Sequence, residues 1–104
     1  MSFGRVLAEA RKKSNLSQKE LAAKIKKEDG QPISAQYLND IEHDRRNPPS
    51  SHLLEQFALE LNTPVEYLYY WAGELPADLK GSQAGQDQVV AAYRAFRKEL
   101  KKKS

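Results

Sequence analysis

The chain has 104 residues, of which 39% are hydrophobic, so it fits one small domain with a modest core and a short appendage. It contains no cysteine, which excludes disulfides and thiolate metal sites, and without a signal peptide or long apolar run we expect a cytoplasmic protein that does not bind a membrane. Residues 1–49 contain 10 basic residues (Lys and Arg) and 7 acidic ones (Asp and Glu). Residues 50–79 contain no basic residue and 5 acidic ones, and residues 80–104 contain 7 basic residues and 2 acidic ones. We therefore expect an acidic partner to meet the first part of the chain, with the middle segment facing away from it or toward another protein.

The first predicted helix covers residues 3–13. Ser2 can cap it, and its core-facing residues are Phe3, Val6, Leu7 and Ala10. A second helix begins after Ser17, because Ser17 and Glu20 have the spacing of a capping box, in which each side chain bonds the backbone amide of the other residue. The apolar face of this helix carries Leu21 and Ile25 beside the small Ala22.

A third helix is predicted after Ser34, which can cap it. Leu38 and Ile41 bury one of its sides. The other side faces outward and carries Gln36, Asn39, Asp40 and His43. Glutamine and asparagine can each pair with adenine through a donor and an acceptor, so this side has the chemistry needed to read base edges in a major groove.

These two helices resemble the helix-turn-helix of the phage Cro and repressor family, often called the XRE family of bacterial regulators. The residues that match its motif are Gln18, Leu21, Ala22, Ile25, Ile33, Ser34, Leu38, Ile41 and Glu42. Outside the motif, Arg11 matches an arginine near the end of the family's first helix, and residues 45–49 resemble the polar loop after its recognition helix. The resemblance covers residues 2–79.

The turn between the two motif helices departs from the family pattern. The family uses a tight turn with a glycine, whereas residues 26–32 form a longer loop here. Gly30 and Pro32 are turn residues, so we expect the loop to bulge outward and leave the crossing of the helices unchanged. Its charged side chains then either touch a DNA backbone or are simply solvated.

Two more helices are predicted after the motif. One covers residues 50–61 and presents the apolar residues Leu54, Phe57, Ala58 and Leu61. The next begins with Thr63 as its cap, a proline in its first turn and Glu66 as the matching acid, and it ends at Gly73. With the family resemblance, this predicts an all-α, five-helix lambda-repressor-like bundle over residues 1–80.

The run Tyr-Leu-Tyr-Tyr-Trp in the fifth helix has more aromatic surface than one small core uses. Members of the resembled family commonly pair through this region, so Tyr67, Tyr70 and Trp71 are candidates for a dimer contact. Alternatively, Leu68 and Trp71 face the core and the tyrosines cover its rim. Residues 75–79 are expected to fold back on the bundle as an irregular turn.

The end of the chain is predicted as a flexible linker, residues 81–86, and a basic amphipathic helix, residues 87–104. One narrow stripe of that helix carries Val89, Tyr93, Phe96 and Leu100. The stripe spans barely two heptads, so we expect it to dock on the bundle or on another copy of the chain. The remaining surface either contacts phosphates or is a solvated chain end. Its basic residues are Arg94, Arg97, Lys98, Lys101, Lys102 and Lys103.

The resemblance implies roles for the polar residues of the motif. Gln18 is expected at the phosphate backbone and Gln36 at the base edges. Asn39 and Asp40 lie one turn further along, where they would read adenine and cytosine. The whole expected DNA-binding set is Gln18, Lys19, Ser34, Ala35, Gln36, Tyr37, Asn39, Asp40, His43, Arg45 and Arg46.

The charged residues of this set fall into two groups. A carboxylate near phosphates is repelled unless it accepts from a cytosine amine or pairs with an arginine, which leaves both interpretations open for Asp40. Arg45 and Arg46 are expected to clamp phosphates. The resemblance also implies a structural pair between Arg11 and Glu42, which ties the first helix to the end of the recognition helix.

An enzyme is not expected. His43 and His52 lack metal-ligand spacing, and no cysteine nucleophile or phosphate-binding glycine loop is present, so we predict no cofactor, metal site or small-molecule substrate. The sequence predicts a sequence-specific binder of double-stranded DNA, a homodimeric bacterial or phage regulator and most simply a repressor, with residues 34–43 in the major groove. The alternative is a protein-interaction module of the same fold, or an antitoxin-type regulator controlled by a protein partner.

Overall fold

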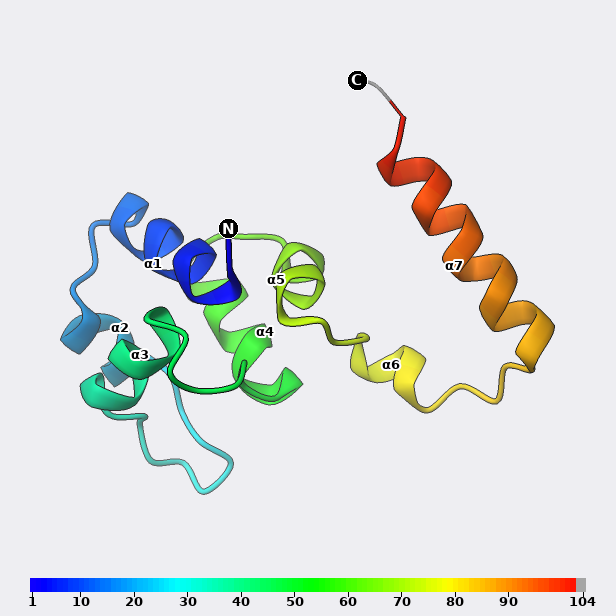
Figure 1. Ribbon diagram of the computed structural model, residues 1–104. Helices are drawn as coiled ribbons and strands as arrows, with labels where there is room; N and C mark the ends of the chain where they lie inside the picture. The colour runs from blue at the N-terminus through cyan, green and yellow to red at the C-terminus, as the bar shows by residue number, and fades with distance from the viewer. Residues whose placement is uncertain (103–104) are drawn as a thin grey trace.

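The computed structural model describes residues 1–102, which form helices and no strand (Figure 1). The helices are α1 (Phe3–Lys13), α2 (Gln18–Lys24), α3 (Ala35–Glu42), α4 (Ser51–Glu60), α5 (Val65–Ala72), α6 (Ala77–Lys80) and α7 (Gln86–Leu100). The predicted all-α class is confirmed. The first three helices begin at the predicted caps: Ser2, Ser17 and Ser34 each accept a hydrogen bond from the backbone amide three residues on, at 3.2, 3.0 and 3.0 Å.

The core lies within α1 to α5. The largest side chains that are fully buried come from these helices and from Ile25, the C-cap of α2; they are Leu7, Leu21, Ile25, Leu38, Ile41, Leu54, Phe57 and Leu68. Each lies at a position that the helical spacing assigns to an apolar face. Neither α6 nor α7 has a buried residue. The first five helices therefore form the bundle, and α6 leads from it to the separate α7 (Figure 1).

The crossing of α1 and α3 depends on a glycine that the sequence alone did not single out. A Cβ atom at Gly4 would lie 2.4 Å from the carbonyl oxygen of Ile41 and 2.6 Å from that of Glu42. Asp44, which follows α3, has a left-handed backbone with φ of 59°, and its side chain bonds the start of α1. Its carboxylate accepts from the Gly4 amide at 3.0 Å and from the Ser2 hydroxyl at 2.6 Å.

The long turn between α2 and α3 is an ordered hairpin rather than a plain loop. Lys26 and Pro32 form an antiparallel bridge, and below it the Ile33 amide donates to the Ile25 carbonyl at 2.9 Å. Gly30 supplies the positive φ of 87° that the tip requires. The tip residues are exposed, so the turn projects outward from the bundle as expected.

A side chain of α4 holds the base of this hairpin. Gln56 accepts from the Lys26 amide and donates to the Lys26 carbonyl, both at 2.7 Å. Nε2 of His52 lies 3.1 Å from the same carbonyl. These contacts join residues that are 26 and 30 positions apart, and the sequence carried no signal for them.

Two expected features of the later chain are wrong. Thr63 does not cap α5: its hydroxyl donates to the Leu61 carbonyl at 3.2 Å, and Pro64 occupies the N-cap position without a side-chain cap. The stretch expected as an irregular turn contains α6, a single helical turn that starts after Pro76. The expected end of α5 is confirmed, because Gly73 adopts the left-handed conformation with φ of 69° and its amide donates to the Tyr70 carbonyl at 3.2 Å.

The aromatic residues of α5 are divided between the core and the surface. Tyr69 is buried, which raises the pKa of its phenol, and Trp71 is partly buried against the core. Tyr67 and Tyr70 remain about half exposed, at 48% and 50%, and both pack edge-on against Trp71. The core residue among the tyrosines is Tyr69, which neither sequence-based alternative singled out.

The C-terminal helix begins one residue earlier than predicted, at Gln86, so residues 81–85 connect it to α6. All of its residues are exposed, and its apolar stripe is not covered by the bundle. Of the basic residues named above, Arg94, Arg97 and Lys98 lie on this helix, and Lys101 and Lys102 follow it. Lys103 lies outside the described residues.

Candidate nucleic-acid interface

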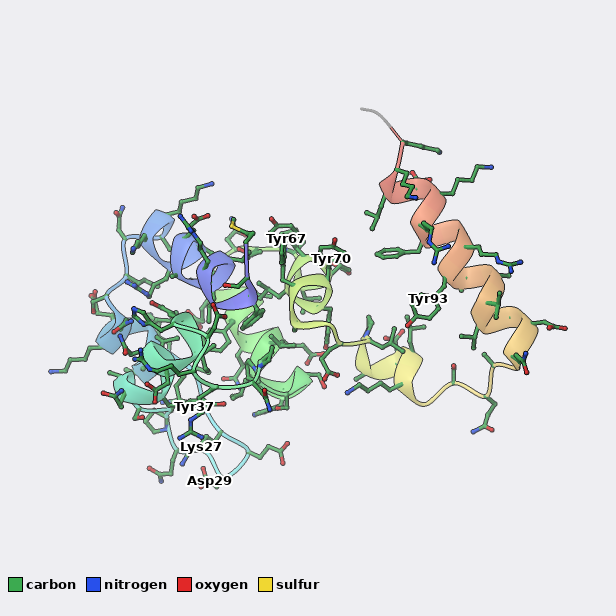
Figure 2. All side chains as sticks on the ribbon, in the orientation of Figure 1. Lys27, Asp29, Tyr37, Tyr67, Tyr70 and Tyr93 are labelled. Carbon is green, nitrogen blue, oxygen red and sulfur yellow. The ribbon has the colours of Figure 1, made fainter. Side chains whose placement is uncertain are left out.

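The outward face of α3 presents its first residues to solvent. Ser34, Ala35 and Gln36 are exposed, and Tyr37 is half-buried. Figure 2 shows Tyr37 on the same side of the molecule as Lys27 and Asp29 of the hairpin. The start of α3 and the hairpin therefore form one side of the bundle that a long ligand can approach.

Behind this face lies the ion pair between Arg11 of α1 and Glu42, the last residue of α3. Arg11 Nε donates to Glu42 Oε2 at 2.6 Å, and Arg11 Nη2 donates to Glu42 Oε1 at 3.0 Å. Arg11 Nη1 donates to the Leu16 carbonyl at 2.8 Å. Both charged residues are buried. The two parallel hydrogen bonds between them hold α3 against α1, and the bond to Leu16 adds the loop that precedes α2.

Gln18, the first residue of α2, extends this contact to the outward face. Its amide nitrogen donates to Glu42 Oε1 at 2.9 Å, and its amide oxygen accepts from Asn39 Nδ2 at 3.2 Å. Gln18 and Asn39 are both half-buried. Asn39 on the outward side of α3 is therefore partly covered, because its amide is bonded to Gln18 of α2.

Arg45 and Asp40 continue the same chain of hydrogen bonds. Arg45 Nη2 donates to Asn39 Oδ1 at 2.7 Å, and Arg45 Nε donates to Asp40 Oδ1 at 3.2 Å. The Gln36 amide donates to the same Asp40 oxygen at 3.0 Å. Of the two interpretations left open for Asp40, the structure shows the pair with an arginine, which offsets its negative charge on this face.

The polar residues therefore form one continuous network from the core to the surface. It runs from Arg11 through Glu42, Gln18, Asn39 and Arg45 to Asp40 and Gln36. The spacing of four between Gln36 and Asp40 was a signal available in the sequence, because side chains four apart on a helix are neighbours. The link from Gln18 to Asn39 had no such signal, since the two residues lie on different helices.

The other expected contact residues have simpler surroundings. The Arg46 guanidinium carbon lies 5.5 Å from the centre of the Tyr37 ring, the arrangement of a cation–π contact. His43 is the C-cap of α3, and its Nδ1 lies 2.9 Å from the Asn39 carbonyl. Lys19 is exposed at the start of α2, beside the capping box of that helix.

The capping box of α2 lowers the pKa of Glu20. Glu20 accepts a hydrogen bond from the Ser17 backbone amide at 2.9 Å, and this bond holds the pKa of its carboxyl below the ordinary value. The ionised form of Glu20 therefore stabilises the start of α2, the helix that carries Gln18.

Comparisons with known proteins agree with this geometry. The sequence model of the family described as helix-turn-helix matches residues 7–68, from the middle of α1 into α5. A comparison with curated proteins finds no match. No helix in residues 1–102 has the length and apolar character needed to cross a bilayer. Because the family match covers more than half of the chain and includes all of α2 and α3, the chain belongs to the Cro/C1-type (XRE) helix-turn-helix family of DNA-binding transcriptional regulators.

Proposed function

We propose that the protein binds a specific double-stranded DNA sequence as a dimer and acts as a transcriptional repressor, with α3 in the major groove. The observation that carries this proposal is the exposed start of α3, where Gln36 projects from a helix held on its inner side by the buried Arg11–Glu42 pair. A rigid support of this kind keeps a reading side chain in register with the bases.

Gln36 is the proposed reader of base edges. Its amide nitrogen donates to Asp40, and rotation about its side chain would let the same amide pair with N6 and N7 of adenine. Asp40 lies beside it with its charge offset by Arg45, so it would accept from the exocyclic amine of cytosine with less repulsion from the phosphates. Asn39 would act as a positioning residue, because Gln18 and Arg45 already hold its amide.

Two of the expected phosphate contacts are exposed: Lys19 on α2 and Arg46 after α3. Such contacts supply affinity and salt dependence but no sequence information. Arg45 would contribute less to them than first expected, because two of its donor groups already bond Asn39 and Asp40.

A single domain of this size reads only a few base pairs. A two-fold dimer would read two half-sites about 34–36 Å apart, so a roughly palindromic site is expected. The half-exposed Tyr67 and Tyr70 of α5, and the exposed stripe of α7, support a dimer because they leave apolar surface uncovered in one copy.

The test is selection of binding sites from a random duplex library with the purified protein. We expect a palindromic motif that Gln36→Ala loses or relaxes. Gln83→Ala is the matched control, because it removes the same amide from an exposed position outside the bundle and should leave the motif unchanged. Selection without any enriched motif would contradict the proposal and favour a protein-interaction module of the same fold.

A further inference from the structure

The C-terminal helix exposes an apolar face that one copy of the chain leaves uncovered. The stripe residues Val89, Tyr93, Phe96 and Leu100 are 42%, 57%, 51% and 56% exposed. The aromatic contact of this stripe with the bundle is Phe96 against Tyr70, whose ring centres lie 6.3 Å apart. A helix of 15 residues is only marginally stable in water by itself. Burial of the stripe would therefore add stability that the isolated chain lacks.

A groove of about 500 Å³ lies between the bundle and this helix. Its walls include Tyr70 and Leu79 on the side of α5 and α6, and Tyr93 and Phe96 on α7. Figure 2 shows Tyr70 at the outer edge of α5 and Tyr93 on the side of α7 that faces the bundle. The groove is thus lined with aromatic and aliphatic side chains from both sides.

Charge indicates what would fill this groove. The segment from residue 50 to residue 79 has 5 acidic residues and no Lys or Arg. Two of those acids line the groove: Glu66, and Glu74, whose carboxylate pairs with Lys80 of α6. The helix α7 and the residues after it are the opposite: residues 86–102 have 5 basic residues against 2 acidic ones. An apolar stripe flanked by basic side chains is therefore complementary to an apolar groove whose bundle side carries acidic residues.

We infer that the groove receives α7 from a second copy of this chain, so that two copies pair by reciprocal insertion of this helix; the inference deepens the dimer of the proposed function and rests on it. The two α7 helices would lie antiparallel. In a parallel pair the basic C-terminal halves would face each other and repel, whereas in an antiparallel pair each faces the N-terminal half of its neighbour. Residue 93 would then lie opposite residue 96 of the partner, and residue 89 opposite residue 100.

The first test measures the mass of the full chain in solution by light scattering and sedimentation. We expect twice the 11.8 kDa of one chain for the natural sequence, and 11.8 kDa for Phe96→Glu. Ala91→Glu is the matched control, because it adds the same charge to the same helix on the side opposite the stripe, and it should still pair. A monomeric natural chain, or a Phe96→Glu variant that pairs normally, would overturn the inference.

The second test uses the absence of cysteine to determine the orientation. Val89→Cys and Leu100→Cys proteins are mixed and oxidised. Antiparallel helices would give a disulfide between the two different variants, whereas parallel helices would join like with like. Mixed disulfides support the inference, and homodisulfides without mixed ones overturn it. Neither readout depends on the folding of the core, since both positions are exposed.

The tests also separate this inference from the proposed function. Phe96→Glu should retain binding to a DNA half-site while it loses the dimer. Gln36→Ala should keep the dimer while it loses the sequence motif. If the chain pairs through α7 but selects no DNA motif, the pairing stands and the proposed function fails. If it selects a motif but stays monomeric, the pairing through α7 and the dimer of the proposed function both fail, and only the sequence-specific DNA binding stands.

Discussion

Replacement of Gly4 by alanine distinguishes two opposite physical effects. Alanine is favoured over glycine inside a helix by about 1 kcal/mol, so helix propensity alone predicts that Gly4→Ala stabilises the protein. The tertiary structure predicts the reverse. The added Cβ atom would lie 2.4 Å from the Ile41 carbonyl oxygen and 2.6 Å from that of Glu42, and both are backbone atoms of α3 that have no side-chain freedom with which to move away.

Overpacking of this kind costs about 1–3 kcal/mol, and here the cost lies toward the upper end because two backbone atoms and the Asp44 carboxylate are all affected. After the gain in propensity is subtracted, we expect the free energy of unfolding to fall by about 1–2 kcal/mol. The midpoint of urea denaturation, followed by circular dichroism, measures this. DNA affinity should fall as well, because the displaced element is α3.

Gly81→Ala is the control for that measurement. A Cβ atom at Gly81 meets nothing within 4 Å, and its φ of −87° suits any residue, so this change should leave the free energy of unfolding nearly unchanged. If Gly4→Ala instead raised the stability, the close approach of α1 to α3 would not be a constraint, and the reasoning would be refuted.

Two further predictions concern ionised groups. Arg11→Ala should lower the free energy of unfolding by about 3 kcal/mol in urea denaturation, because it leaves the buried Glu42 carboxylate without its cation. Arg5→Ala in the same helix breaks only an exposed pair and should cost less than about 0.5 kcal/mol; equal losses would show that burial of the pair is unimportant. The depressed pKa of Glu20 means that its contribution to stability is present above the pKa of the unfolded chain and is lost as the pH falls through the folded value. Glu20→Gln should therefore be less stable than the natural chain at neutral pH, with a gap that closes in acid; a gap independent of pH would contradict the role of the charge.

Local chemistry in the sequence accounts for most of the helix boundaries. Ser2, Ser17 and Ser34 each bond an amide within three residues, and Gly73 ends α5 through its own positive φ. Such contacts involve neighbours along the chain, so their spacing can be read directly. The apolar periodicity likewise identified the buried faces of the first four helices.

The same reasoning failed at two positions in and just before α5. Thr63 has the residue type and spacing of a cap, yet α5 begins after Pro64 and the Thr63 hydroxyl donates back to Leu61. On α5, periodicity did not reveal that Tyr69 is the tyrosine that packs into the core. At Thr63 the competing contact is local, a bond to the Leu61 carbonyl two residues back, whereas at Tyr69 tertiary packing decided which tyrosine is buried.

The sequence by itself determined that this chain folds into helices, where most of them begin, and which side of α3 carries the amides. Only the tertiary structure decided how those amides are held. Asn39 bonds Gln18 across 21 positions and Gly4 bonds Asp44 across 40, whereas the bond of Arg11 to Glu42 across 31 positions was expected only from the family resemblance. Contacts of this range leave no periodic signal in a single sequence, because they depend on how complete helices cross and not on the spacing of residues within one helix.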